Sequence, residues 1–289
     1  MNGMAHSMER ATEAIDEALT KAKVKAEEAI CIHAGMTGAD FPYEYELLKE
    51  ALIASTGIRN VKIENDCMIA YRGGTSSSIG AVLCIGTGTN AAVIRPDAEP
   101  FIYGYYVREE DSGGESLGNL ALRAVLDSDV GLGPETSLKA LILAHYGVGN
   151  SDELMLSWIQ GKLSSRKSIV PIAFEAAAEG DEVAIELIRA FGIRNAKYIR
   201  AGIRRFDIAD CDMEVVLSGS LFKARNPLLR ETVETELRRY FPAIRIVNAV
   251  YEPVVGAVLM ALDRIHGQPY PFDGQLIMKS AREMGLMRF

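Results

Sequence analysis

The chain has 289 residues, of which 48% are apolar and 24% charged; these values are typical of a globular protein and exclude a disordered or collagen-like chain. At roughly 150 residues per domain, this length indicates two domains. Acidic residues outnumber basic ones by 39 to 31, and the net charge of −8 argues against nucleic acid as a partner.

We expect neither a membrane anchor nor a leader peptide. The longest apolar stretch, Val254–Leu262, is far shorter than the ~20 residues that span a bilayer. Residues 1–30 are polar and helical in pattern, unlike a secretory signal. The sequence therefore predicts a cytoplasmic protein without a membrane partner.

Cysteine and histidine spacing gives no sign of a metal site within one chain. There is no C-x-x-C pair and no histidine at zinc-like spacing, which favours reduced, buried thiols over a disulfide framework. A cluster assembled between two subunits is the alternative that the spacing leaves open. The four cysteines are Cys31, Cys67, Cys84 and Cys211.

The first quarter of the sequence alternates between helical and strand patterns. Apolar residues recur on one helical face over Met8–Lys25, and a continuous apolar run follows at Ala29–Ala34. A second helix is predicted over Tyr43–Ser55 and ends at Gly57, and a strand at Val61–Ile63 leads into a short helix. This alternation favours parallel strands with crossover helices, hence an α/β fold.

The remaining sequence predicts a second α/β region. Strands over Ile79–Ile85 and Ala91–Ile94 form a hairpin. The region 117–206 is mostly helical in pattern, and further strands are expected at Met213–Leu217 and Ala243–Asn248.

The glycine- and serine-rich segment Gly73–Ser78 is the clearest linker, and we place a domain boundary there. Residues 1–77 are then a partial first α/β domain, and 78–265 a second domain with a helical insertion at about 117–206. Residues 266–289 are expected to return to the first domain.

The hairpin turn has an unusual composition: Gly86, Thr87, Gly88, Thr89 and Asn90. Glycines let the backbone approach a ligand and point successive N–H groups at an anion, while the hydroxyls and the amide add donors. An anion-binding turn and an ordinary hairpin turn both remain open. Neither of the two common phosphate-loop motifs, G-x-x-x-x-G-K-[ST] and G-x-G-x-x-G, occurs in the sequence.

Asp66 follows a predicted strand and begins a helix. At the carboxyl edge of a sheet, where ligands usually bind, it could accept a proton from a substrate hydroxyl. Capping of the helix by Asn65 and Asp66 is the structural alternative.

An acidic segment, Glu109–Asp111, precedes a flexible Ser-Gly-Gly loop. Its carboxylates could bind sugar hydroxyls or hold Mg²⁺ through water, or they could simply begin a helix. The Ser218–Ser220 turn after an apolar strand could admit a nucleotide or merely end the strand.

Two helical features favour a structural interpretation. Trp158 is expected to pack rather than bind. A basic stripe is interpreted as a solvated helix face, and it consists of Arg194, Lys197, Arg200 and Arg204.

Together these features resemble the BadF/BadG/BcrA/BcrD ATPase family, which includes N-acetylglucosamine kinases and lies within the actin–hexokinase–Hsp70 superfamily. The resemblance spans about residues 10–265. Seven segments carry it in order: Gly35–Asp40, Asn65-Asp66 with Ala70, Gly86–Asn90, the acidic Ser-Gly-Gly loop before Leu117-Gly118, Ala176–Ala184, Val216–Gly219 and Pro253–Ala257.

The resemblance implies two ribonuclease H-like (actin/hexokinase-type) α/β domains around a cleft that closes on ATP, Mg²⁺ and a sugar. Asp66 matches the catalytic base, and Thr37 and Asn65 match sugar-contacting positions. Gly86–Asn90 matches the second phosphate motif, and Gly219 with Ser220 the adenosine motif.

The sequence departs from the family at two places. The family reads Gly-Asp-Glu-Gly-Ser-Gly in the acidic loop, so Glu110, with Asp111 beside it, stands where a sugar-binding aspartate is expected. Family members also begin with a strand carrying Asp-Gly-Gly-Gly-Thr and two further strands. We expect the first domain to lack this segment of roughly 30 or more residues, counting strands of ~5–6 residues and their turns.

The resemblance thus predicts ATP-dependent phosphorylation of a sugar or amino-sugar hydroxyl by a cytoplasmic homodimer, with activity limited by the absent first phosphate motif. Two alternatives stay open. One is an ATPase that activates a partner redox enzyme through an iron–sulfur cluster between subunits. The other is a non-catalytic binder of sugar or nucleotide.

Overall fold

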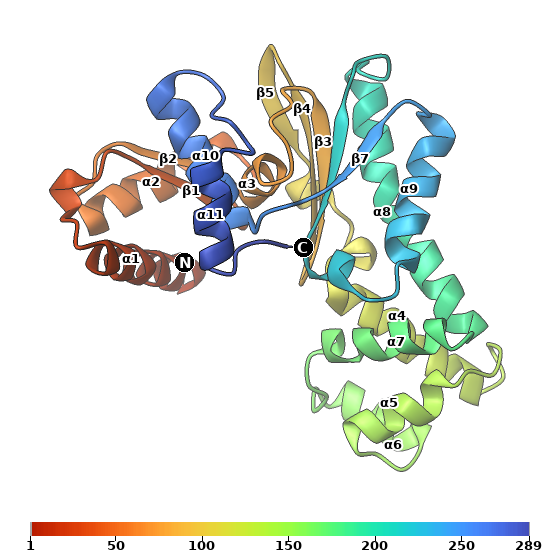
Figure 1. Cartoon of the computed structure of the whole chain (residues 1–289). Coiled ribbons are helices and arrows are strands. Elements are labelled where there is room, and N and C mark those ends of the chain that lie inside the picture. The colour runs from red at the N-terminus through yellow and green to blue at the C-terminus, as the bar shows by residue number, and fades with distance from the viewer. Residues whose placement is uncertain (1, 289) are drawn as a thin grey trace. The chain divides into compact units, whose positions relative to one another are not determined.

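Figure 1 shows a computed structural model of the protein, which describes residues 2–288. The chain forms two compact units. The first unit combines the residues up to Ser77 with those from Asn248 onward, and the second extends from Ser78 to Val247.

The first unit is built on two parallel strands, β1 (Ile32–Met36) and β2 (Val61–Asn65). Side chains alternate between the two faces of a strand, so Ile32, Ala34 and Met36 point to one side of β1. There they join a small apolar core with residues of α1 (Asn2–Ala22) and α2 (Pro42–Thr56). Helix α2 ends at Gly57 in a left-handed conformation, as its glycine predicts.

The other face of β1 is covered by α3 (Asp66–Arg72), whose Ile69 lies so close that a Cβ at Gly35 would be 2.5 Å from it. Helix α10 (Pro253–His266) packs on both α3 and β1. A Cβ at Gly256 would lie 1.8 Å from the carbonyl oxygen of Ile69, so only glycine permits this approach. Helix α11 (Gln275–Glu283) shares an apolar cluster with α10.

The second unit therefore ends before α10, whereas the expected boundary lay at residue 265. Arg72 at the end of α3 is buried and forms a 2.8 Å ion pair with Asp263 of α10. These contacts join α10 to α3 across 191 positions of the sequence. The apolar pattern of Val254–Leu262 gave no indication of which sheet it would cover.

The second unit contains a five-stranded sheet of order β5-β4-β3-β6-β7. Strand β3 pairs antiparallel with β4 and parallel with β6, and β4 pairs antiparallel with β5. The strands are β3 (Gly80–Ile85), β4 (Thr89–Arg95), β5 (Ala98–Ile102), β6 (Glu214–Ser218) and β7 (Arg245–Asn248). Strand β5 was not predicted, because Pro100 and two exposed residues obscure its pattern, as edge strands permit.

Helices pack around this sheet and form one large apolar core with it. They are α4 (Gly113–Asp129), α5 (Leu138–Tyr146), α6 (Ser151–Ile159), α7 (Val170–Ala178), α8 (Glu182–Arg205) and α9 (Leu228–Tyr240). Short 3₁₀ turns connect them: η2 (Gly104–Tyr106), η3 (Glu109–Asp111), η4 (Arg166–Ile169) and η5 (Ser220–Lys223). Trp158 packs against the core, as predicted.

The basic stripe on α8 is not simply a solvated face, and that interpretation was wrong for half of it. Arg194 pairs with Asp111 at 2.7 Å and Arg200 with Glu236 at 2.8 Å, and both acidic partners are buried or nearly so. Lys197 and Arg204 are exposed. A three-residue repeat does not reveal which arginines meet a carboxylate on a neighbouring element.

Two kinds of feature are absent from residues 2–288, the part of the chain that the structure describes. None of their helices is both long and apolar enough to span a bilayer. Nor do these residues contain a group of three or more His, Cys, Asp or Glu side chains that could hold a metal ion. All four cysteines are free thiols.

Candidate active site

Thr37 and Asp66 meet at the carboxyl ends of the two strands of the first unit. The register pairs Met36 with Asn65, so the residues that follow these two positions leave the sheet side by side. The Thr37 hydroxyl donates a 2.8 Å hydrogen bond to Oδ2 of Asp66. Asp66 is half-buried and Thr37 is exposed, so the carboxylate is oriented by a neighbour and still open to a ligand.

Asn65 behaves differently from the expected sugar contact, because it is fully buried. Its amide nitrogen donates to the carbonyl of Ala39 at 3.0 Å and to Oδ1 of Asp40 at 2.8 Å, and its oxygen accepts from the N–H of Cys67. This is the capping alternative raised by the sequence. Asn65 fastens the loop after β1 to the start of α3 and so helps to place Thr37 beside Asp66.

Glu44 supports the same loop from α2. Its carboxylate oxygen Oε2 accepts hydrogen bonds of 2.8 Å from the N–H groups of both Asp40 and Phe41. The loop from Thr37 to Phe41 is therefore held at both ends. The sequence signal that could have shown this is the glutamate three residues after the helix N-cap, the second member of a capping box.

The predicted phosphate turn of the second unit joins β3 to β4. Its backbone closes on itself, because Gly86 N–H donates to the carbonyl of Gly88 at 2.8 Å. Thr89 is buried and its hydroxyl accepts from Gly113 N–H at 2.9 Å, while the Asn90 amide oxygen accepts from Gly104 N–H at 2.8 Å. The side chains of Thr89 and Asn90 thus fasten the turn to neighbouring segments.

The exposed part of this turn is Thr87 and Gly88. Within residues 2–288, their backbone N–H groups have no hydrogen-bond partner. Two successive free N–H groups are the arrangement that binds an anion such as a phosphate. The turn therefore keeps donors available to a ligand while its other groups are engaged.

Gly219 and Ser220 lie against the same turn. A Cβ at Gly86 would be 3.7 Å from the Ser220 hydroxyl oxygen. Gly219 has φ +103°, and a Cβ there would lie 2.2 Å from the carbonyl oxygen of Ile85, the last residue of β3. The parallel strands β3 and β6 can end this close together only because residue 219 is glycine.

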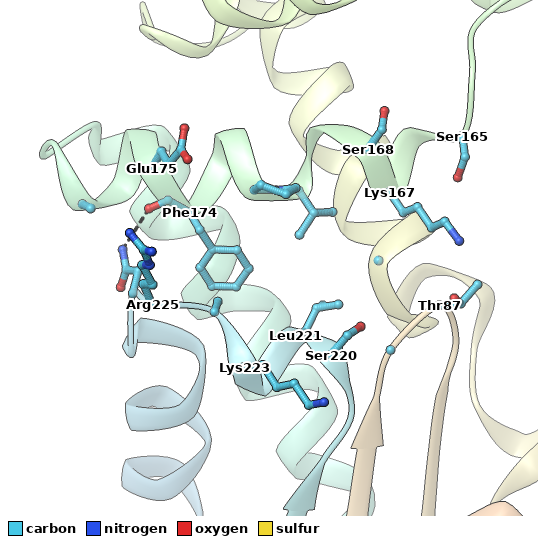
Figure 2. A pocket seen from close by; sticks show the side chains of 17 residues that line it. Thr87, Ser165, Lys167, Ser168, Phe174, Glu175, Ser220, Leu221, Lys223 and Arg225 are labelled. Atoms are coloured by element: carbon cyan, nitrogen blue, oxygen red, sulfur yellow. Dashed lines mark hydrogen bonds between the residues drawn. The ribbon is translucent and has the colours of Figure 1, made fainter. Parts of the chain in front are cut away.

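A cavity of about 810 Å³ opens beside these two motifs, a size suited to a nucleotide. Figure 2 shows Thr87 and Lys167 on one side of it and Glu175 and Arg225 on the opposite side. Apolar side chains line the space between them, among them Val170, Pro171, Phe174, Leu221 and Ala224. Both sides therefore carry polar and charged groups, and the apolar middle offers a surface for a flat base.

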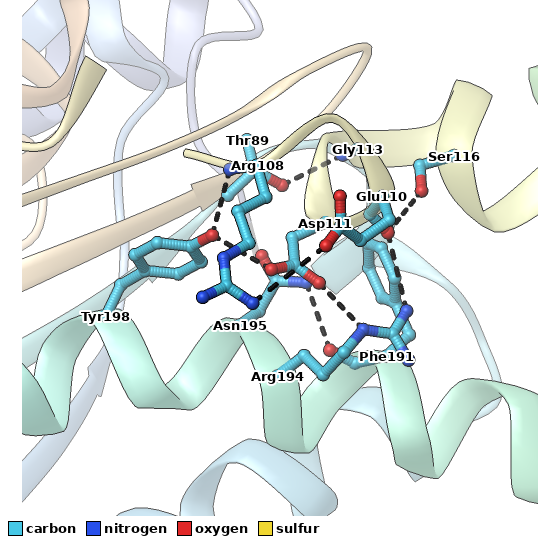
Figure 3. A network of polar contacts seen from close by, with 10 residues as sticks. All are labelled: Thr89, Arg108, Glu110, Asp111, Gly113, Ser116, Phe191, Arg194, Asn195 and Tyr198. Atoms are coloured by element: carbon cyan, nitrogen blue, oxygen red, sulfur yellow. Dashed lines mark hydrogen bonds and ion pairs between the residues drawn. The ribbon is translucent and has the colours of Figure 1, made fainter. Parts of the chain in front are cut away.

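The acidic segment does not present Asp111 to a ligand. Asp111 is buried, its Oδ1 accepts from Nε of Arg194 at 2.7 Å, and its Oδ2 accepts from the Tyr198 hydroxyl at 2.9 Å, as Figure 3 shows. Burial, together with the adjacent Asp111 carboxylate, raises the pKa of Tyr198. Asp111 thus anchors η3 to α8.

Glu110 is exposed, and its carboxylate lies 4.0 Å from the guanidinium of Arg108. Of the two predicted acidic contacts, only Glu110 has a side chain that a ligand can reach. The segment is bound at its backbone, because the Ser116 hydroxyl donates to the carbonyl of Glu110 at 2.5 Å.

Sequence reasoning missed the residues of the segment 165–175 that line the cavity. No motif marks them, and the pattern there indicates only helices. The signal available was the pair Arg166-Lys167 in an acidic chain, just before a proline-initiated helix. These residues are Ser165, Lys167, Ser168, Val170, Pro171, Phe174 and Glu175.

Comparison with known proteins places this chain in a family. A model of the BadF/BadG/BcrA/BcrD ATPase family matches residues 2–261. The chain belongs to this family. The resemblance stated from the sequence motifs is thereby confirmed.

Two curated proteins resemble the chain over most of its length. It is 28% identical over 247 residues to the N-acetyl-D-glucosamine kinase of Dictyostelium discoideum, covering 81% of this chain and 75% of that protein. It is 22% identical over 254 residues to the N-acetylmuramic acid/N-acetylglucosamine kinase of Clostridium acetobutylicum, covering 86% and 82%.

A solved structure shares the fold. It is that of a provisional N-acetylglucosamine kinase from Chromobacterium violaceum, with a TM-score of 0.68, 20% identity, and coverage of 90% of this chain and 86% of that one. At this level of identity the match shows the fold alone. The predicted α/β fold with two domains is confirmed.

Proposed function

We propose that the protein transfers the terminal phosphate of ATP to a hydroxyl group of a sugar, with N-acetylated amino sugars as the substrate class. The observation that carries this proposal is the Asp66 carboxylate, held by the Thr37 hydroxyl at the carboxyl ends of β1 and β2 in a chain of this ATPase family. The names of both curated relatives support the choice of substrate class.

In the proposed reaction Asp66 acts as the general base. The Thr37 hydroxyl occupies Oδ2 of Asp66, and Oδ1 has no hydrogen-bond partner within residues 2–288, so Oδ1 can accept the proton of the attacking hydroxyl. The sugar oxygen then forms a bond to the terminal phosphorus while the bond from phosphorus to the bridging oxygen of ADP breaks. Asn65 and Glu44 contribute by positioning the loop from Thr37 to Phe41.

The nucleotide is proposed to occupy the cavity of the second unit. Its phosphates would meet the free N–H groups of Thr87 and Gly88, and its base would lie near Phe174. Gly219 contributes close backbone packing and Ser220 a hydroxyl beside the turn. Glu110 is kept as a candidate sugar contact.

Mg²⁺ is proposed to accompany the nucleotide as the counter-ion of its phosphates. Asp111 does not fit the role of a ligand to this ion, because both of its oxygens already accept hydrogen bonds from α8. No step of the reaction is assigned to the ion. On the resemblance alone, we also propose a cytoplasmic homodimer, which sedimentation of the purified protein would test.

The decisive experiment measures ADP release from MgATP in the presence of N-acetylglucosamine, N-acetylmuramic acid or glucose. We expect release that depends on an N-acetylated sugar and is lost in Asp66→Asn. Nucleotide binding without sugar-dependent release would instead identify a binding protein. ATP hydrolysis that ignores every sugar, in a protein that carries iron, would favour the activator alternative.

A further inference from the structure

One cation on the Thr87 side of the cavity has no role in the family resemblance. Lys167 is exposed, lies on η4 and lines the cavity together with Gly86 and Thr87. Figure 2 shows its side chain on the same side of the cavity as Thr87. Lys223 and Arg225 line the same cavity, but Figure 2 shows Arg225 on the side opposite Thr87.

In space, Gly114 lies between Lys167 and the phosphate turn. Gly114 donates its N–H to the carbonyl of Gly86 at 2.9 Å. A Cβ at Gly114 would lie 3.3 Å from the Cβ of Lys167 and 3.4 Å from that same carbonyl oxygen. The stem of the lysine therefore starts directly above the turn, and its length lets the ammonium reach a group bound there.

Glu115 holds the backbone of Lys167 in this place. Its Oε2 accepts from the Ser165 hydroxyl at 2.6 Å and from Lys167 N–H at 3.2 Å, and its Oε1 accepts from Arg166 N–H at 3.2 Å. Arg166 also pairs with this carboxylate at 2.9 Å. Burial alone would raise the pKa of Glu115, but these hydrogen bonds outweigh it and lower the pKa.

We propose that Lys167 binds the phosphate groups of the nucleotide and that Glu115 is its positioning residue. This inference rests on the proposed nucleotide site. A lysine ammonium is a compact charge that binds phosphate oxygens, and here it adds a cation to a turn whose own donors are neutral N–H groups. The base is proposed to lie near Phe174, so the affinity for adenosine alone should not depend on Lys167.

The test compares the affinities of ATP, ADP and adenosine for the whole protein by calorimetry. In Lys167→Ala we expect ATP affinity to fall about tenfold, which corresponds to a charged hydrogen bond partly exposed to water, while adenosine affinity stays unchanged. Lys167→Arg keeps the charge and should retain most of the ATP affinity. Lys162→Ala, at an exposed lysine that does not line the cavity, is the matched control and should change neither affinity.

Glu115→Gln tests the positioning role. It should lower the affinity for ATP and leave the affinity for adenosine unchanged. Combining it with Lys167→Ala should lower the ATP affinity little further. Equal losses of ATP and adenosine in Lys167→Ala, or no loss at all, would overturn the inference. If the unaltered protein binds neither ligand, the proposed function itself fails, which is a separate and recognisable result.

Discussion

The two units carry candidate functional groups of different kinds. In the first unit the candidate site consists of side chains. The Thr37 hydroxyl donates to Asp66, and Asn65 holds the loop that carries Thr37. In the second unit the proposed phosphate turn offers backbone N–H groups, and close approaches at Gly113 and Gly219 shape it. Side-chain chemistry can be altered by isosteric replacement without rebuilding the chain. A backbone site is disrupted where an added Cβ would collide with a neighbouring carbonyl group, as at Gly113 and Gly219.

The largest expected effect separates catalysis from nucleotide binding. Asp66→Asn keeps the size of the side chain and an acceptor for the Thr37 hydroxyl, but it cannot take up the proton. We expect the rate of sugar phosphorylation to fall by about 10²–10⁴-fold. ATP affinity, measured by calorimetry on the same preparation, should be unchanged; a parallel loss of ATP binding would show that the two units do not divide the work in this way.

Gly113→Ala tests the backbone site. Gly113 has φ +65°, and a Cβ there would lie 2.3 Å from the carbonyl oxygen of Thr87. We expect a loss of about 2–5 kcal/mol in the free energy of unfolding, together with loss of nucleotide binding.

Gly131→Ala is the matched control for this change. Gly131 has φ +75° in the same unit, but no atom lies within 4 Å of the added Cβ. It should cost only about 1 kcal/mol and leave nucleotide binding intact. Urea denaturation of both variants measures the difference, and equal costs would mean that the close approach at Gly113 is unimportant.

Thr37→Val removes the hydroxyl that orients Asp66 and leaves the shape of the side chain. Because Thr37 is exposed and water can partly replace it, we expect only about a tenfold decrease in kcat. Thr37→Ser should restore most of the rate. A Thr37→Val protein as slow as Asp66→Asn would assign Thr37 a direct part in the reaction.

The smallest expected effect lies away from both sites, at the N-cap of α8. Asp181 accepts hydrogen bonds from Ala184 N–H at 2.9 Å and from the hydroxyls of Thr136 and Ser137 at 2.8 and 2.7 Å. Burial alone would raise the pKa of Asp181, but these bonds outweigh it and lower the pKa below 3.8. Asp181→Ala should cost about 1 kcal/mol near neutral pH.

The pH dependence of this contribution has a definite sign. The folded protein binds the Asp181 proton less tightly than the unfolded chain does, so the stabilisation is complete above pH 3.8 and is lost as the pH falls through the lower folded value. Urea denaturation from about pH 6 to about pH 3 should show the gap between the unaltered protein and Asp181→Ala closing as the solution becomes acidic. A constant gap would contradict the assignment.

Much of the fold followed from local pattern, since strands, helix ends and the hairpin depend on neighbours in sequence. The α/β class and the turn Gly86–Asn90 were predicted because glycine, alternation and apolar runs act over a few residues. Strand β5 was not predicted, because its pairing with β4 rather than its own composition makes it a strand. The packing of α10 on α3 was not predicted from the sequence either, since it joins residues nearly two hundred positions apart.

The candidate site shows the same division. The sequence by itself determined which residue types were available: Asp66 after a strand, a glycine–threonine turn, and Gly219 after another strand. Only the tertiary structure decided which of their groups are free, because that depends on partners distant in sequence. It buried Asn65 and Asp111 among such partners, left Thr37 beside Asp66 and Thr87 at the cavity, and, through Glu115, placed Lys167 above the turn.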